Sequence, residues 1–202
     1  MKLAAIVSAL TVSGTAAFAP SMGGRSATSL DGAVVYYSTS TGNTETVAQY
    51  IADAAGLGDI IDIGDASEDE IKGFDGLIVG APTWHTGADE QRSGTSWDDF
   101  LYDTLPNIDL EGKTVAVFGM GDQEGYGDNY CDAAGELYDL FEAKGCKMLG
   151  LTSTDGYNHS DSKAERDGKF CGLMMDEDNQ YDLSEERAKN WVEQLKSEGF
   201  AF

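Results

Sequence analysis

The chain is poor in the residues that build metal and disulfide sites. Its 202 residues include three cysteines, Cys131, Cys146 and Cys171, and two histidines, His85 and His159. An odd number of cysteines with no C-x-x-C pair indicates neither a disulfide scaffold nor a zinc or iron–sulfur centre. The histidines occur in no H-x-x-E or H-E-x-x-H spacing. We therefore expect no metal centre, with the cysteines as reduced thiols in structural positions. No Ser-His-Asp set or Cys-His pair is indicated either, so we also expect no catalytic residues.

Basic residues are also scarce. The chain has 13 Lys and Arg against 36 Asp and Glu. Residues 1–30 hold two of the bases and none of the acids, so residues 31–202 carry 11 bases against 36 acids, a net charge of −25. Repulsion from phosphate excludes a nucleic-acid binder and a binder of anionic membranes. Two interpretations stay open: docking on basic partners, or an acidic surface that serves general solubility.

Apolar runs bounded by turn residues recur five times, without alternating polar positions, and helical patterns lie between them. Such runs are typical of strands buried on both faces of a parallel sheet. The alternation of strand and helix favours an α/β doubly wound fold in one domain, residues 31–202. The predicted strands are residues 33–37, 59–63, 76–81, 114–120 and 147–151, and the predicted helices are 44–55, 97–105, 129–144 and 184–198. Ser184 is the predicted N-cap of the last helix.

The loop after the first strand is rich in neutral hydrogen-bond donors before a helix. A helix N-terminus with such donors suits a phosphate. The loop has no lysine, so it does not match G-x-x-x-x-G-K-[ST], and no G-x-G-x-x-G occurs. The neutral donors predict a binding site for the terminal phosphomonoester of a ligand, buried in the loop. The alternative is a turn that only caps the helix. The candidate residues are Thr39, Ser40, Thr41, Gly42, Asn43 and Thr44.

Two further loops bring aromatic residues to the same place. With strand order 2-1-3-4-5, the reversal lies between the first and third strands, where ligands bind such sheets. Trp84 follows the third strand and Tyr126 the fourth, so the two rings can stack on either side of a planar heterocycle. Considered alone, Trp84 would instead be interpreted as a side chain that only covers the protein surface. The candidates are Pro82, Thr83, Trp84, His85, Thr86 and Gly87, then Gly119, Met120, Gly121, Asp122, Tyr126 and Asn129.

These three loops, in this order and spacing, resemble those of the flavodoxins, and the likeness covers residues 31–202. Residues 39–44 match the family pattern T/S-x-T-G-[NK]-T. The polar segment 153–180 resembles the insertion that splits the fifth strand in long-chain flavodoxins. The resemblance implies a five-stranded parallel sheet of order 2-1-3-4-5 and FMN as cofactor, with Asp132 and Asp178 as further cofactor-binding residues. One departure is His85, where many long-chain relatives carry Asn.

The resemblance also implies a function. FMN would carry one electron at a time between its quinone, semiquinone and hydroquinone states, and Asp122, Glu124 and Asp128 would make the hydroquinone strongly reducing. A protonated His85 could stabilise the reduced anion. The implied protein is an electron carrier that replaces ferredoxin, with photosystem I and ferredoxin-NADP reductase as partners, and we expect a monomer. The rivals are an FMN-dependent NAD(P)H:quinone reductase and a phosphoacceptor domain.

The first 30 residues have the composition of a targeting segment. Lys2 precedes an apolar run and small residues, as in a secretory signal, and the run is too short for a mature membrane anchor. Residues 21–29 contain an arginine and hydroxyl residues but no acid. Residues 17–20, Ala-Phe-Ala-Pro, resemble the junction of bipartite presequences of algal complex plastids. We expect a plastid stromal protein once residues 1–30 are removed; the alternative is secretion.

Overall fold

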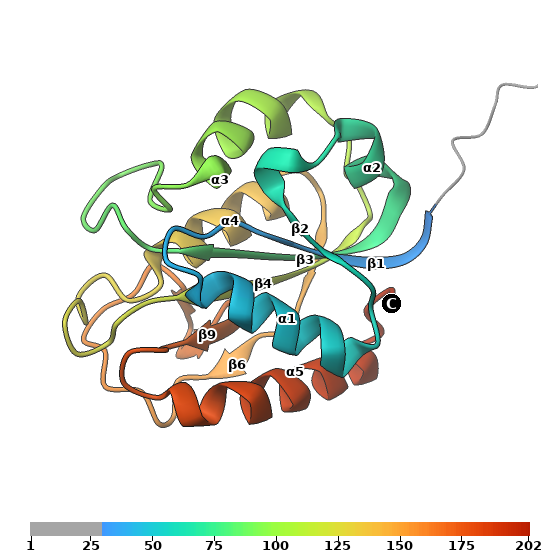
Figure 1. Cartoon of the computed structure of the whole chain (residues 1–202). Coiled ribbons are helices and arrows are strands. Elements are labelled where there is room, and N and C mark those ends of the chain that lie inside the picture. The colour runs from blue at the N-terminus through green and yellow to red at the C-terminus, as the bar shows by residue number, and fades with distance from the viewer. Residues whose placement is uncertain (1–29) are drawn as a thin grey trace, which may run out of the picture.

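A parallel sheet forms the centre of the protein. Figure 1 shows the computed structural model, which describes residues 30–202. The strands lie in the order β2-β1-β3-β4-β5, with β9 also paired to β4, so the predicted flavodoxin-like topology is confirmed. The strands are β1 (Leu30–Tyr37), β2 (Ile60–Asp62), β3 (Phe74–Pro82), β4 (Thr114–Met120), β5 (Lys147–Leu149) and β9 (Leu173–Met175).

Helices cover both faces of the sheet, which explains the continuous apolar runs. Leu77 and Val79 of β3 pack with α3 and α4 on one face, and Ile78 between them packs with α1 and α5 on the other. Because successive side chains of a strand point to opposite faces, the central strands are buried along almost their whole length, from Gly76 to Pro82 in β3 and from Val115 to Met120 in β4. The helices are α1 (Asn43–Ala55), α2 (Glu68–Gly73), α3 (Ser96–Asp99), α4 (Asp132–Ala143) and α5 (Ser184–Glu198).

Three helix predictions need correction. The helix expected over 97–105 is α3 followed by a π-helical turn, Phe100–Thr104, and a 3₁₀ turn, Leu105–Asn107. Helix α4 begins at Asp132, three residues later than expected. Ser184 is not an N-cap: it is the first residue of α5 after Leu183, and its hydroxyl donates to Glu177 instead.

The fifth strand is split in two. β5 pairs with Thr114–Ala116 of β4, and β9 pairs with Phe118–Met120 of the same strand. The intervening chain forms a small antiparallel sheet of β6 (Thr152–Ser153), β8 (Lys169–Phe170) and β7 (Glu165–Arg166). The predicted insertion is therefore present, but its expected range of 153–180 wrongly included β9.

The chain re-enters the sheet at Gly172 with almost no space. A Cβ on this residue would lie 1.9 Å from the Val117 carbonyl oxygen. Glycine is needed here because backbone meets backbone. This close approach allows β9 to complete the edge of the sheet beside the loop that follows β4.

Candidate functional site

A cleft of about 430 Å³ opens at the carboxyl edge of the sheet. This edge lies at the left in Figure 1. Its lining comes from the chain that follows β1, β3, β4 and β9, which are neighbours in the sheet. Crevices at this edge are where doubly wound sheets bind ligands. The lining residues are Thr41, Asn43, Thr44, Pro82, Thr83, Trp84, Thr86, Met120, Gly121, Asp122, Tyr126, Asn129, Glu177 and Asp178.

The start of α1 forms one end of the cleft. Gly42 is the N-cap residue at φ 96°, and the helix has no side-chain cap. The Gly42 N–H donates to the Thr39 hydroxyl at 2.9 Å, which folds the loop tightly back on itself. The first N–H groups of a helix have no intrahelical partner, and the helix dipole adds positive potential there. This end of the cleft is therefore suited to an anion held by neutral donors.

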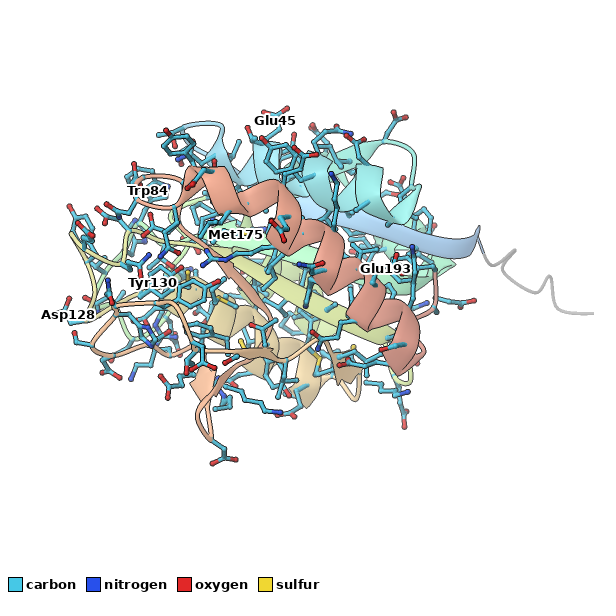
Figure 2. The ribbon with its side chains drawn as sticks, turned by 90° about the horizontal axis from the view of Figure 1, so that it is seen from below. Glu45, Trp84, Asp128, Tyr130, Met175 and Glu193 are labelled. Carbon is cyan, nitrogen blue, oxygen red and sulfur yellow. The ribbon has the colours of Figure 1, made fainter. Side chains whose placement is uncertain are left out.

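Trp84 and Tyr126 provide the aromatic surfaces of the cleft. Their exposed fractions are 50% and 57%, large for residues of this size. Half-exposed rings that line a cleft offer flat apolar faces to a ligand. Asp128 belongs to the loop that carries Tyr126, and Trp84 lies at the same end of the molecule as Asp128 (Figure 2). Both aromatic predictions are thus brought into one cleft.

The Tyr126 loop is held by an aspartate turn. Asp122 Oδ1 accepts N–H groups from Glu124 at 3.0 Å and Gly125 at 2.8 Å, and the Asn179 amide donates to it at 2.9 Å. The Tyr126 N–H donates to the Asp122 carbonyl at 2.9 Å. The Gly125 N–H above all, with the Asn179 amide, lowers the pKa of the Asp122 carboxyl. The loop therefore keeps a carboxylate beside the cleft at neutral pH.

Two more carboxyl groups reach the cleft from the loop after β9. Glu177 and Asp178 both line it. Burial, followed by the negative charges of Asp122 and Asp176, raises the pKa of Asp178. The sequence did not single out Glu177. A usable signal was present, because Glu177 directly precedes the predicted Asp178 in a run of three acidic residues. The cleft is acidic on this side and disfavours an anion placed there.

Seven of the predicted site residues do not line the cleft. The His85 ring points into its own loop, with Nδ1 2.6 Å from the Gln91 carbonyl oxygen and 3.7 Å from Asp98 Oδ2. Asp132 is buried and its Oδ1 accepts the Lys163 N–H at 2.7 Å, which anchors the insertion. Cofactor contact by the seven stays a prediction. They are Thr39, Ser40, Gly42, His85, Gly87, Gly119 and Asp132.

The rest of the described chain offers no metal site. Within residues 30–202, no group of three or more His, Cys, Asp or Glu side chains is placed to hold a metal ion. The three cysteines are buried and free of disulfides. Within the same range, no helix combines the length and apolar character needed to cross a membrane.

The fold and the cleft together define a class of protein. It is a doubly wound α/β protein whose cleft, at the carboxyl edge of the sheet, combines a helix N-terminus suited to a phosphate with two aromatic side chains. Comparison with known proteins narrows this class. The sequence profile of the flavodoxin family matches residues 35–191. The chain belongs to the flavodoxin family.

Individual relatives agree over nearly their whole length. The chain is 50% identical over 165 residues to a flavodoxin of Picosynechococcus sp., covering 80% of this chain and 94% of the relative. It is 48% identical over 167 residues to one of Nostoc sp., covering 81% and 95%. A crystal structure of Fusobacterium nucleatum flavodoxin bound to flavin mononucleotide has a TM-score of 0.74 and 32% identity, covering 82% and 97%.

Proposed function

We propose that this flavodoxin binds FMN in the cleft and serves as a low-potential one-electron carrier. The observation that carries the proposal is the meeting of the α1 N-terminus with Trp84 and Tyr126 in one cleft of about 430 Å³. A phosphate end plus two flat apolar faces fits a planar ring with a phosphorylated tail. The FMN-bound Fusobacterium relative supports the same assignment. The protein is a carrier and not an enzyme.

The lining residues divide between the two ends of the cofactor. Thr41, Asn43 and Thr44 would receive the phosphate through neutral donors, and Trp84 and Tyr126 would flank the ring. FMN itself supplies the capacity to accept and release single electrons. The protein orients the ring, excludes water from its faces and surrounds it with negative charge.

Negative charge at the cleft determines how strongly the reduced cofactor donates an electron. Asp122, Glu177 and Asp178 all line it. A carboxylate about 7 Å from an added negative charge, at an effective dielectric of about 20, repels it by about 2.4 kcal/mol. That energy corresponds to roughly 100 mV for one charge. We therefore expect the second electron to enter at a potential well below that of free FMN.

The decisive experiment is a dithionite titration of the purified protein followed by absorption. We expect two flavin bands that pass through a long-wavelength blue intermediate, and a second-electron potential far below that of free FMN. A colourless protein that cannot be reconstituted with FMN would overturn the proposal. A second potential equal to that of free FMN would overturn the electrostatic part alone.

We further propose that this is a long-chain flavodoxin of the plastid that replaces ferredoxin between photosystem I and ferredoxin-NADP reductase. The split fifth strand and the charge of −25 over residues 31–202 support it. Residues 1–30, the proposed presequence, lie outside the described range apart from Leu30. Electron transfer to the reductase should slow steeply as salt rises, because opposite charges drive the encounter. A reporter carrying residues 1–30 should enter the plastid of an alga; its secretion would refute this localisation.

A further inference from the structure

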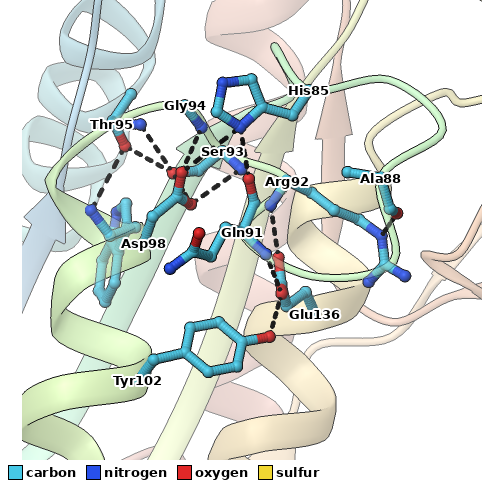
Figure 3. Close-up of polar contacts among 11 residues, drawn as sticks. His85, Ala88, Gln91, Arg92, Ser93, Gly94, Thr95, Asp98, Tyr102 and Glu136 are labelled. Atoms are coloured by element: carbon cyan, nitrogen blue, oxygen red, sulfur yellow. Dashed lines mark hydrogen bonds and ion pairs between the residues drawn. The ribbon is translucent and has the colours of Figure 1, made fainter.

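The loop that presents Trp84 is held by two buried carboxylates that the electron-carrier function does not by itself explain. We define the Trp84 loop as residues 84–95, between β3 and α3. Four consecutive backbone N–H groups of this loop, from Gln91 to Gly94, donate to only two side chains, Glu136 of α4 and Asp98 of α3 (Figure 3). Both carboxylates are buried, with exposed fractions of 5% and 9%.

Each carboxylate takes two neighbouring N–H groups. Glu136 Oε1 accepts from Gln91 at 2.7 Å and Oε2 from Arg92 at 2.9 Å. Asp98 Oδ1 accepts from Ser93 at 3.1 Å and Oδ2 from Gly94 at 2.9 Å. Hydrogen bonds to an ionised acceptor are stronger than neutral ones, and paired bonds fix orientation as well as distance.

The other side of the same peptide segment holds Trp84. The Arg92 carbonyl accepts the N–H groups of Trp84 and His85, both at 3.1 Å. The Gln91 carbonyl lies 2.6 Å from His85 Nδ1, so this ring nitrogen carries the proton it donates. Arg92 therefore links the two: its N–H donates to Glu136, and its carbonyl accepts from the backbone N–H of Trp84.

The Glu136 carboxylate is also held from the π-helical turn that follows α3. The Tyr102 hydroxyl donates to Glu136 Oε1 (Figure 3). Burial, followed by this hydrogen bond, raises the pKa of Tyr102, so the phenol keeps its proton. Gln91 has φ 57°, a left-handed conformation that is unfavourable for a residue with a side chain. The paired bonds to Glu136 hold the loop in this conformation.

We propose that Glu136 and Asp98 are positioning residues that fix the Trp84 face of the cleft before the cofactor arrives. This inference rests on the proposed function, because it assigns the fixed face to FMN. Trp84 is half exposed, and a mobile ring would lose conformational freedom on stacking. A loop that already fixes the Trp84 backbone limits that loss, so FMN binds more tightly.

The test is a double-mutant cycle on FMN affinity. Glu136→Gln keeps the shape but offers one oxygen in place of two, so one N–H faces an amide nitrogen. We expect FMN to bind about tenfold more weakly, equal to about 1.4 kcal/mol. With Trp84→Ala already present, the same change should cost less than about twofold, because its effect passes through Trp84. Flavin fluorescence, which stacking on Trp84 quenches, should rise in the Glu136→Gln protein.

Matched control variants distinguish the effect of losing the loop contacts from the effect of losing one negative charge. Glu142→Gln removes an equal charge from an exposed residue of α4 and should change neither affinity nor fluorescence. Asp98→Asn tests the second carboxylate, with exposed Asp99→Asn as its control. Near-UV circular dichroism of the apoprotein identifies any variant that does not fold, and Asp98→Asn then replaces Glu136→Gln in the cycle.

Three results would overturn the inference: unchanged FMN binding, equal weakening with and without Trp84, or loss of folding in both carboxylate variants. The last two would show that the carboxylates support the fold and not the Trp84 face. Failure of the wild-type protein to bind FMN would instead overturn the proposed function, and the inference with it.

Discussion

Asp176 joins the two loops that carry the acidic side of the cleft. Its carboxylate is fully buried. Oδ2 accepts from Gln123 through the backbone N–H at 3.1 Å and the side-chain amide at 2.8 Å. Oδ1 accepts the N–H groups of Asp178 at 3.1 Å and Asn179 at 2.9 Å. Because Gln123 lies in the Tyr126 loop and Asp178 lines the cleft, we predict that Asp176→Asn weakens both the fold and the site.

The magnitude follows from these four bonds, because the Asn179 side-chain amide, which donates to Oδ1 at 3.1 Å and Oδ2 at 2.9 Å, can keep the remaining oxygen. An asparagine has one carbonyl oxygen, so the two donors that face its amide nitrogen lose their acceptor whichever way the amide turns. A buried donor left unsatisfied costs about 1–3 kcal/mol, and Asp176→Asn should therefore lower the free energy of unfolding by about 2–6 kcal/mol. FMN should also bind more weakly, since the links from Asp176 to the Tyr126 loop and to Asp178 are weakened.

Urea unfolding of the apoprotein measures the first effect, with Asp182→Asn as control. Asp182 is an exposed acid in the same loop, so its replacement removes an equal charge without burying any unsatisfied group. A loss below about 1 kcal/mol for Asp176→Asn would refute the reasoning. So would a loss equal to that of the control, because net charge would then account for the effect.

Three other changes have expected outcomes. Gly172→Ala should destabilise by about 1–3 kcal/mol in urea unfolding, because its Cβ would meet the Val117 oxygen at 1.9 Å, whereas Gly58→Ala, with no atom within 4 Å, should not. The pKa of Asp122 is lowered from 3.8, so its stabilising contribution is present above about pH 4 and is lost as the pH falls through the lowered value. Asp122→Asn should reduce this loss of stability at acid pH. An unchanged dependence of the unfolding free energy on pH would contradict the assignment. Asp178→Asn should raise the second-electron potential by up to roughly 100 mV in spectroelectrochemistry, and an unchanged potential would show that this group is too far from the ring.

Local sequence patterns were sufficient where one element could be recognised from its own residues. The run 114–120 matches β4 at both ends, since after Thr114 this central strand is apolar and buried. The short strand Leu173–Met175 could not be recognised in the same way, because it is one end of an apolar patch, residues 170–175, that the structure divides between β8 and β9. Its pairing with β4 is what makes it a strand. Likewise, a periodic pattern over 97–105 does not distinguish an α-helix from the π and 3₁₀ turns that follow Asp99.

The same distinction applies to the residues of the site. The sequence placed Trp84 and Tyr126 in one site, because the order of strands forces their loops to be neighbours. It could not orient His85, whose ring turns toward Gln91 and Asp98 and does not line the cleft. It also gave no sign that Glu136 holds a loop 45 positions earlier in the chain.

The sequence by itself therefore determined the fold class, the three loops and the kind of ligand, since apolar periodicity, glycine hinges and donor-rich turns act over a few residues. Only the tertiary structure decided which side chains reach the cleft and which carboxylates hold its walls. The physical reason is that a hydrogen bond depends on distance and direction in space. Asp176 with Gln123, and Glu136 with Gln91, are far apart in sequence and meet only when the sheet and its helices have packed.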